Sequence, residues 1–153
     1  YNSAMSSIKK RLLLTVAASA GLCAAAQTPS STARFGSPRE ADWRPPTNLP
    51  PGAEYHLVYE DPRTHGIQAL VRFPSGYAVP DHTHSCAETL VVLSGRLAVS
   101  SQGSERTLRR GDYAVLPAGT PHALRAAGWG KTVFTAATDG PYDLTPAGPG
   151  PQP

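Results

Sequence analysis

The stretch that decides the fold runs from Gly76 to Gly95: Gly-Tyr-Ala-Val-Pro-Asp-His-Thr-His-Ser-Cys-Ala-Glu-Thr-Leu-Val-Val-Leu-Ser-Gly. His82 and His84 are two residues apart, a spacing that places both imidazoles on one face of a β-strand. Glu88 follows after Ser85-Cys86-Ala87, which is long enough for a turn. Its carboxylate is therefore expected on the next strand, opposite the histidines. Because imidazole and carboxylate together suit a borderline divalent cation, the stretch predicts a hairpin with three metal ligands.

A second stretch, Gly111 to His122, supplies a fourth candidate ligand. A tight turn at Arg110-Gly111-Asp112 is followed by a short apolar run, and Pro117-Ala118-Gly119 then reverses the chain. His122 begins the next expected strand. A barrel can bring that strand against the first hairpin, so His122 is a candidate to complete the site.

Short β-rich runs separated by turn residues surround both stretches, which indicates an all-β sandwich or barrel. The expected strands cover residues 55–60, 67–73, 77–82, 88–93, 96–101, 105–108, 113–116, 122–126 and 131–137. Core candidates are the apolar residues Leu90, Val92, Leu97, Val99, Val115, Leu124, Val133 and Phe134.

The two stretches resemble the two motifs of the cupin superfamily. The first motif, G(x)5HxH(x)3E(x)6G, is filled by Gly76, His82, His84, Glu88 and Gly95. The second, G(x)5PxG(x)2H, is filled by Gly111, Pro117, Gly119 and His122. Some versions of the second motif add an asparagine four residues later, where this chain has Ala126. The resemblance implies a cupin double-stranded β-helix, a jelly-roll barrel, with an extended N-terminal arm, similar to small bacterial single-domain cupins.

The resemblance also implies one divalent transition metal held by His82, His84, Glu88 and His122. Three nitrogens and one oxygen leave one or two positions of an octahedral shell open, which admits Fe, Mn, Zn, Ni or Co. Intrinsic affinity favours Zn or Cu over Mn and Fe where metal supply is not controlled.

Two functions are compatible with such a site. One is a metal-dependent oxygenase or related enzyme that acts on a small carboxylate or hydroxylated substrate, with Glu88, Tyr77 and Arg72 as catalytic candidates. Arg72 would be the natural clamp for a substrate carboxylate. The other is a cupin module that binds or senses a small molecule or metal without turnover, because fold and metal alone do not choose between these functions.

Other polar residues are assigned less specific roles. Gln68 is a further candidate for the barrel mouth, and Cys86 is interpreted as a turn residue in preference to a soft metal ligand. Tyr113 is expected to pack in preference to acting as an acid. His56 and His65 lie outside both motifs and are assigned to the surface.

The N-terminus has the order of a secretory signal peptide. Residues 1–4 are interpreted as an extension before a natural start at Met5, and residues 5–26 as the signal, with basic Lys9-Lys10-Arg11, an apolar run and a small-residue cleavage site at Ala24-Ala25-Ala26. The protein is therefore expected to be periplasmic or secreted, with no membrane association after the signal is removed. The remaining organisation is a linker and Pro-rich arm at 27–54, the cupin domain at 55–137 and a loose Pro/Gly-rich tail at 138–153.

Charge and composition restrict the partners. The formal net charge is +3, and without the three basic leader residues eleven Lys and Arg balance eleven Asp and Glu. A neutral body lacks the basic footprint of a nucleic-acid-binding protein, so no nucleic acid is expected as a partner. A small-molecule ligand is expected instead, together with the homodimer that the resemblance implies.

Overall fold

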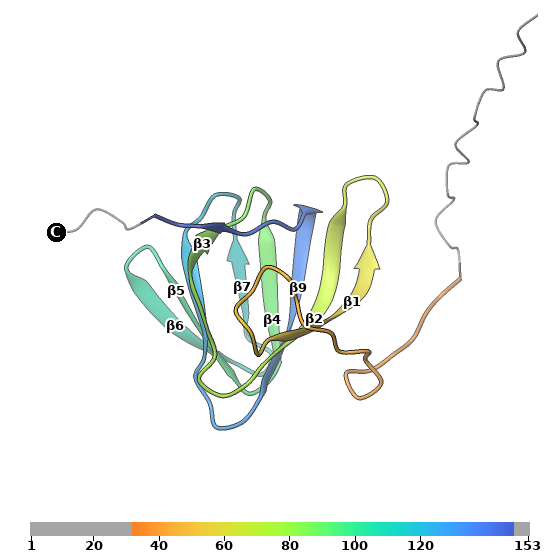
Figure 1. Ribbon diagram of the computed structural model, residues 1–153, viewed down its shortest axis with the longest axis horizontal. Coiled ribbons are helices and arrows are strands. Elements are labelled where there is room, and N and C mark those ends of the chain that lie inside the picture. Colours follow the sequence, from red (N-terminus) through yellow and green to blue (C-terminus); the bar gives the residue numbers. More distant parts are fainter. Residues whose placement is uncertain (1–31, 149–153) are drawn as a thin grey trace, which may run out of the picture. The chain divides into compact units, whose positions relative to one another are not determined.

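The computed structural model describes residues 32–148, so the predicted signal peptide lies outside the described residues. The described chain folds into two five-stranded sheets that face each other (Figure 1). The strands are β1 (Glu54–Glu60), β2 (Gly66–Phe73), β3 (Ala78–Thr83), β4 (Glu88–Ser94), β5 (Arg96–Ser101), β6 (Ser104–Arg109), β7 (Tyr113–Leu116), β8 (His122–Ala126), β9 (Thr132–Pro141) and β10 (Thr145–Pro146).

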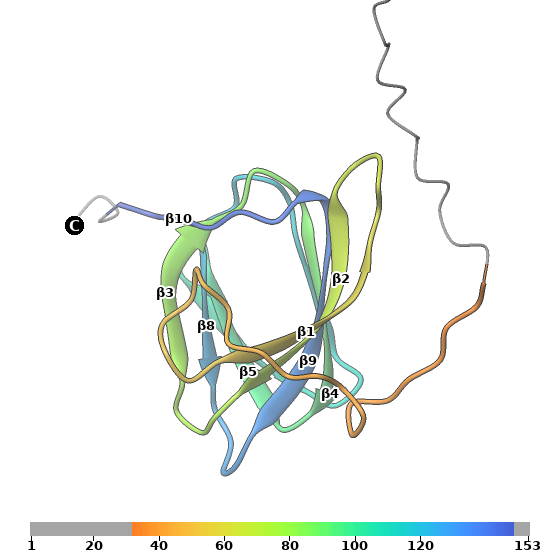
Figure 2. The same ribbon diagram turned by 45° about the vertical axis from the view of Figure 1, so that its right-hand side comes forward.

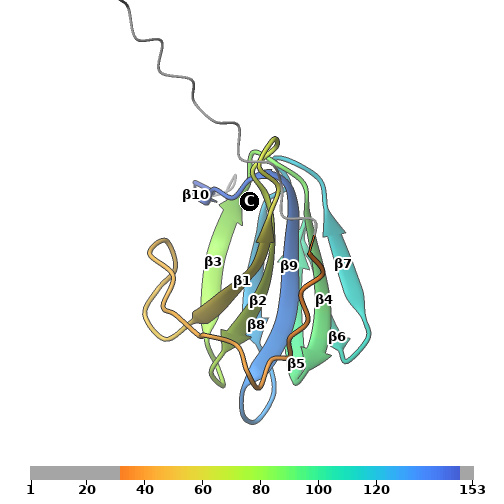
Figure 3. The ribbon, with the colours of Figure 1, turned by 90° about the vertical axis from the view of Figure 1, so that its right-hand side faces the viewer.

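The strand order identifies a jelly-roll barrel. One sheet has the order β1-β2-β9-β4-β7 and the other β10-β3-β8-β5-β6, and the paired strands are antiparallel. The chain changes sheet between β3 and β4, and Figures 2 and 3 show the two sheets enclosing one interior. The prediction of an all-β jelly-roll barrel is confirmed. No described helix has the length and apolar character needed to cross a membrane.

The core fills the space between the sheets with the inward residues of each strand. Six predicted core residues are buried there: Leu90, Val92, Leu97, Val99, Leu124 and Phe134. Phe134 also packs edge-on against Phe73, with ring centroids 4.9 Å apart. Alternation along the strands therefore decides which residues are buried.

The prediction was wrong for Val115 and Val133. Val115 is 60% exposed and Tyr113 is 68% exposed, because both lie on the outward face of the edge strand β7. Val133 lies between the buried Thr132 and Phe134, and its side chain therefore faces the other way. A short apolar run does not reveal which of its faces meets the core.

Glycines of the two motifs make the turns that join the strands. Gly95 links β4 to β5 with a φ of 78°. A Cβ at this position would lie 2.8 Å from the Cα of Thr132, so both the backbone conformation and the close packing require glycine. Gly119 also has a positive φ, 73°, and its N–H donates to the carbonyl of His84.

The N-terminal arm is attached to the same barrel. The Arg72 guanidinium lies 4.3 Å from the centre of the Trp43 ring, and Leu49 packs against the core. The hydroxyl of Tyr77 donates to the carbonyl of Pro50 at 2.6 Å. The arm therefore packs on the barrel of its own chain.

The prediction of a loose chain from Thr138 onward was wrong for residues 138–146. Strand β9 continues to Pro141, and β10 pairs with β3 through Thr145 opposite Thr83. The Asp139 carboxylate accepts the N–H of Ala87 at 2.9 Å, which ties this segment to the β3–β4 turn. Because this segment is rich in proline and glycine, its composition did not indicate a strand, and the strands with which it pairs lie far away in the sequence.

Burial of the β4 side chains predicts a clear contrast between two apolar residues. Leu90→Ala is expected to lower the free energy of unfolding by about 3–5 kcal/mol, because Leu90 is fully buried and its removal leaves a cavity. The matched change Val115→Thr, on the exposed face of β7, is expected to alter it by less than about 0.5 kcal/mol. Urea unfolding measures both, and equal losses would contradict the described orientation of these strands.

Candidate metal centre

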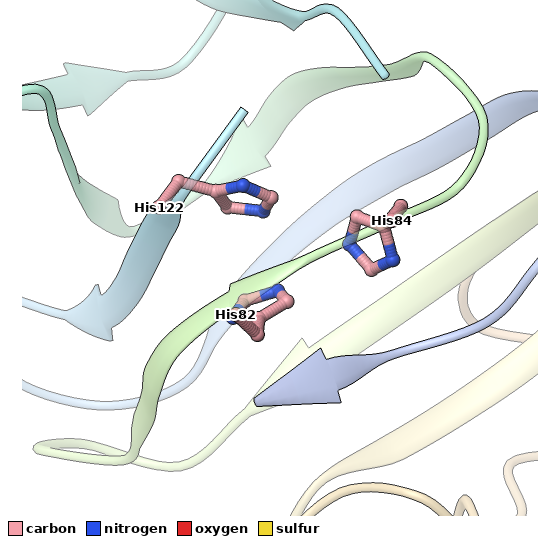
Figure 4. A group of neighbouring side chains, drawn as sticks. All are labelled: His82, His84 and His122. Atoms are coloured by element: carbon pink, nitrogen blue, oxygen red, sulfur yellow. The ribbon is translucent and has the colours of Figure 1, made fainter. Parts of the chain in front are cut away.

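Three histidines, His82, His84 and His122, form one group with their rings close together (Figure 4). His82 lies on β3 directly opposite His122 on β8, and their ring centroids are 4.2 Å apart. His84 follows the end of β3, with its ring 4.9 Å from that of His82 and 5.2 Å from that of His122. One ring nitrogen from each lies within 4.8 Å of the others, and all three side chains are buried. The two-residue spacing in the sequence thus places the imidazoles of His82 and His84 on the side that faces His122.

Backbone carbonyls set the tautomer of each imidazole. The Nδ1 atoms of His82 and His122 lie 2.7 and 2.9 Å from the carbonyls of the residues two positions earlier, Pro80 and Thr120. Nδ1 of His84 is hydrogen-bonded to the carbonyl of Asp143. A carbonyl oxygen only accepts, so each Nδ1 carries the proton and each Nε2 keeps its lone pair. Histidine metal ligands are oriented in this way.

Glu88 brings a carboxylate to the same point from the other sheet. It is the first residue of β4 and is 3% exposed. Its Oε2 lies 3.5 Å from Nε2 of His84 and 3.5 Å from Nε2 of His122. The structure therefore brings together all four predicted ligand side chains.

Three of the four candidate ligand side chains have a buried atom with no hydrogen-bond partner. Nε2 of His84, Nε2 of His122 and Oε2 of Glu88 are buried and unpaired within residues 32–148. Lone pairs that face one another in a buried space cost several kcal/mol unless a cation lies between them. Atoms bound to one transition metal at about 2.0–2.2 Å are separated by roughly 3–4 Å, which is close to the spacing seen here. The residues fit a divalent metal.

The protonation of the site is also suited to a cation. Burial opposes the charge of Glu88, but His122 and His84 outweigh it and hold the pKa of this carboxyl at about 2. Burial lowers the pKa of His82, so its imidazole is neutral at neutral pH. For His84, burial also acts against the charge, yet the neighbouring Glu88 raises its pKa overall, so without a metal a proton competes for the Nε2 lone pair. The carboxylate is thus ionised and available to a metal.

A cavity of about 300 Å³ extends from the site through the barrel. His82 and Glu88 line it, and its walls are mostly apolar. The lining is completed by Pro46, Thr47, Asn48, Leu49, Tyr55, Ile67, Ala69, Val71, Phe73, Val79, Leu124, Phe134, Ala136 and Tyr142. The Pro-rich arm therefore supplies one wall of a chamber that opens onto the metal-ligand side chains.

Two residues of the site were not predicted from the sequence, Tyr142 and Asp143. The ring of Tyr142 lies 5.0 Å from that of His84 and borders the cavity. Burial, with the charges of Glu88 and Asp143, raises the pKa of Tyr142 well above its usual range. Asp143 holds His84 through its carbonyl, and its carboxylate accepts the N–H of Ser85 at 2.8 Å. Neither residue lies in a motif, and nothing in the Pro/Gly-rich sequence around them indicated a functional role.

Three predicted mouth residues lie elsewhere. Arg72 is on the outward face of β2, where its guanidinium pairs with Glu54 at 2.7 Å, so it is not a clamp for a ligand in the cavity. Tyr77 packs against Phe73, and its hydroxyl is used by the arm. Gln68 is exposed on the outer face of β2. These corrections share one cause. The sequence pattern of a strand does not reveal which of its faces points into the barrel.

The remaining assignments concern residues outside the ligand group. Cys86 is a buried free thiol whose Sγ lies 3.4 Å from the carbonyl of Pro141, and it is not among the clustered metal-binding groups. Tyr113 is 68% exposed, so its predicted packing role was wrong. His65 is exposed as predicted, and His56 is partly buried beside the arm.

Comparison with known proteins extends these observations. Residues 69–137 match the Cupin domain family, which spans both motifs. The chain is 34% identical over 101 residues to the DNA damage-repair/toleration protein DRT102 of Arabidopsis thaliana, covering 65% of this chain and 31% of that protein. It is 45% identical over 51 residues to quercetin 2,3-dioxygenase of Bacillus subtilis, covering 33% of this chain and 15% of that enzyme. The chain thus spans less than a third of the length of these curated relatives.

Solved structures agree with the fold. The structure of KdgF from Halomonas sp. is 26% identical, with a TM-score of 0.59, and the match covers 71% of this chain and 94% of that one. The strand order, the filled motifs and the family match lead to one conclusion: this chain belongs to the cupin superfamily.

Proposed function

We propose that this cupin binds one divalent transition metal through His82, His84, Glu88 and His122, and uses it to activate a small oxygen-bearing substrate in an oxygenase reaction. The observation that carries the proposal is the set of three buried, unpaired ligand atoms on His84, Glu88 and His122. Such atoms are uncommon in folded proteins, where most buried polar groups have a partner. A bound metal accounts for all three at once.

The residues of the chain prepare the site for such a reaction. A metal bound here would polarise a coordinated oxygen as a Lewis acid and, if redox-active, could react with dioxygen. The carbonyls of Pro80, Thr120 and Asp143 hold the imidazoles in the ligating tautomer. The apolar walls exclude water, which strengthens electrostatic interactions inside the cavity. Glu88 is placed both at the metal position and at the cavity wall, where it can accept a proton from a substrate.

The oxygenase assignment is supported by the similarity to quercetin 2,3-dioxygenase over 51 residues, although the chain spans 15% of that enzyme. An apolar chamber of about 300 Å³ suits a small organic molecule better than a highly charged one. Dioxygen chemistry would require Fe or Mn, whereas Zn would restrict the site to Lewis-acid chemistry. The substrate class proposed is a small carboxylate or hydroxylated compound.

A cupin module that binds a ligand without turnover is the second candidate. It is favoured by the walls of the cavity, which are largely apolar and contain neither Arg72 nor Tyr77. Fewer polar groups near the substrate leave fewer routes for proton transfer. The homodimer expected from the sequence stays a prediction for either function.

Metal binding provides the first test. Wild-type protein loaded with Co(II) or Zn(II) is expected to retain about one metal per chain by elemental analysis, since its ligand set is complete. The double variant His82→Ala, His122→Ala is expected to retain almost none, because two of the four ligands are gone. The wild type should also gain thermal stability with the metal, by about 2.7 kcal/mol at one hundred times Kd.

A matched double variant controls for the loss of two histidines. His56→Ala, His65→Ala removes two imidazoles remote from the cluster and is expected to keep the wild-type metal content. Equal metal content in both double variants would show that the proposed ligand set is incorrect.

Oxygen uptake separates the two candidate functions. Fe(II)-loaded wild type is expected to consume dioxygen when small phenols or hydroxy acids are added, and Glu88→Gln is expected to lose most of this rate because the carboxylate no longer ligates or accepts a proton. An oxygen electrode measures the rate. Tight substrate binding by the Fe(II)-loaded protein without oxygen uptake would instead support the binding module.

A further inference from the structure

The segment that follows β9 covers the metal-ligand side chains. It is anchored on both sides of Tyr142: β9 ends at Pro141, and β10 pairs with β3 through Thr145 opposite Thr83. Figure 2 shows it passing from β9 across the barrel to β3. Asp143 adds two further contacts, one to Nδ1 of His84 and one to the N–H of Ser85. The position of Tyr142 is therefore set by the same contacts that orient a metal ligand.

Tyr142 touches both the ligand group and the cavity. Its ring lies 5.0 Å from that of His84 with an interplanar angle of 36°. It lines the cavity together with His82 and Glu88. A molecule bound in this cavity can therefore contact Tyr142 as well as His82 and Glu88.

The hydroxyl of Tyr142 is a hydrogen-bond donor with no acceptor among the described residues. Its side chain is partly buried and forms no hydrogen bond with another residue of the described range 32–148. Tyr77, the tyrosine buried nearby, donates instead to the carbonyl of Pro50 at 2.6 Å. The Tyr142 hydroxyl is not among the fully buried unpaired atoms of these residues, so it is accessible beside the cavity, where a bound ligand can supply its acceptor.

Apart from His82 and Glu88, the other polar side chains of the cavity come from the N-terminal part of the described chain. Thr47 and Asn48 belong to the N-terminal arm, and Tyr55 lies on β1 next to it. Most remaining lining residues are apolar. Tyr142 is the cavity-lining hydroxyl that packs against a histidine of the ligand group.

We propose that Tyr142 donates a hydrogen bond to the metal-bound oxygen of the ligand, and so makes the site selective for phenolate, enolate or carboxylate oxygen. This inference rests on the proposed function, because it assumes a metal between the four ligand side chains. Tyr142 is then a specificity-determining residue that contacts the ligand and not the metal. The small, mostly apolar chamber of about 300 Å³ favours a small and largely apolar molecule, such as a 1,2-dihydroxybenzene, over a highly polar one.

The test uses Co(II)-loaded full-length protein and catechol as the probe, without oxygen. Catechol binding is followed by the change in the visible spectrum of Co(II). Tyr142→Phe removes the hydroxyl and keeps the ring, so its Co(II) content and melting temperature are expected to equal those of the wild type. Its Kd for catechol is expected to rise about 10- to 100-fold, which is the effect of losing a hydrogen bond to a charged oxygen.

Tyr55→Phe is the matched control, because it removes a hydroxyl from the same cavity on the arm side. It is expected to bind catechol as the wild type does. An unchanged catechol Kd in Tyr142→Phe, an equal loss in Tyr55→Phe, or no catechol binding by the Co(II)-loaded wild type would each overturn the inference. Failure of the wild type to retain Co(II) would instead overturn the proposed function, and the inference with it.

Discussion

The structure depends on the convergence of three imidazole nitrogens and one carboxylate inside an otherwise apolar barrel. Two of the histidines come from strands of one sheet, and Glu88 comes from the first position of β4 in the other. A cation held between them would link the two sheets directly. Because buried lone pairs repel one another when no cation is present, binding a metal and closing the barrel are coupled in free energy.

The segments before β1 and after β9 both contribute residues to the ligand site. The N-terminal arm closes one side of the cavity with Leu49, and its attachment uses Tyr77 and Arg72. The C-terminal segment orients His84 through Asp143 and places Tyr142 beside it. Residues that contribute to stability therefore also shape the ligand site. Arg72 and Tyr77, which were suggested as catalysts, have structural partners instead, because their polar groups bind Glu54 and the arm.

Much of the fold could be predicted because turn chemistry and strand periodicity are local. The β5, β7 and β8 boundaries agree with the predicted ranges, and glycines such as Gly95 occupy turns that other residues cannot adopt. The faces of the strands were less predictable. Val115 is as apolar as the buried Val92, yet it lies on the outer face of an edge strand, and only the order of strands in the sheet decides this.

The sequence by itself determined the barrel class and the residues that can bind a metal, since the spacing of His82, His84 and Glu88 and the position of His122 are properties of the chain alone. It even determined two of the tautomers, because His82 and His122 each use the carbonyl two residues earlier. The tertiary structure decided the third, which depends on Asp143, 59 residues beyond His84. It also decided which tyrosine meets the cavity. Contacts between distant segments depend on how the two sheets close, and no local pattern encodes that closure.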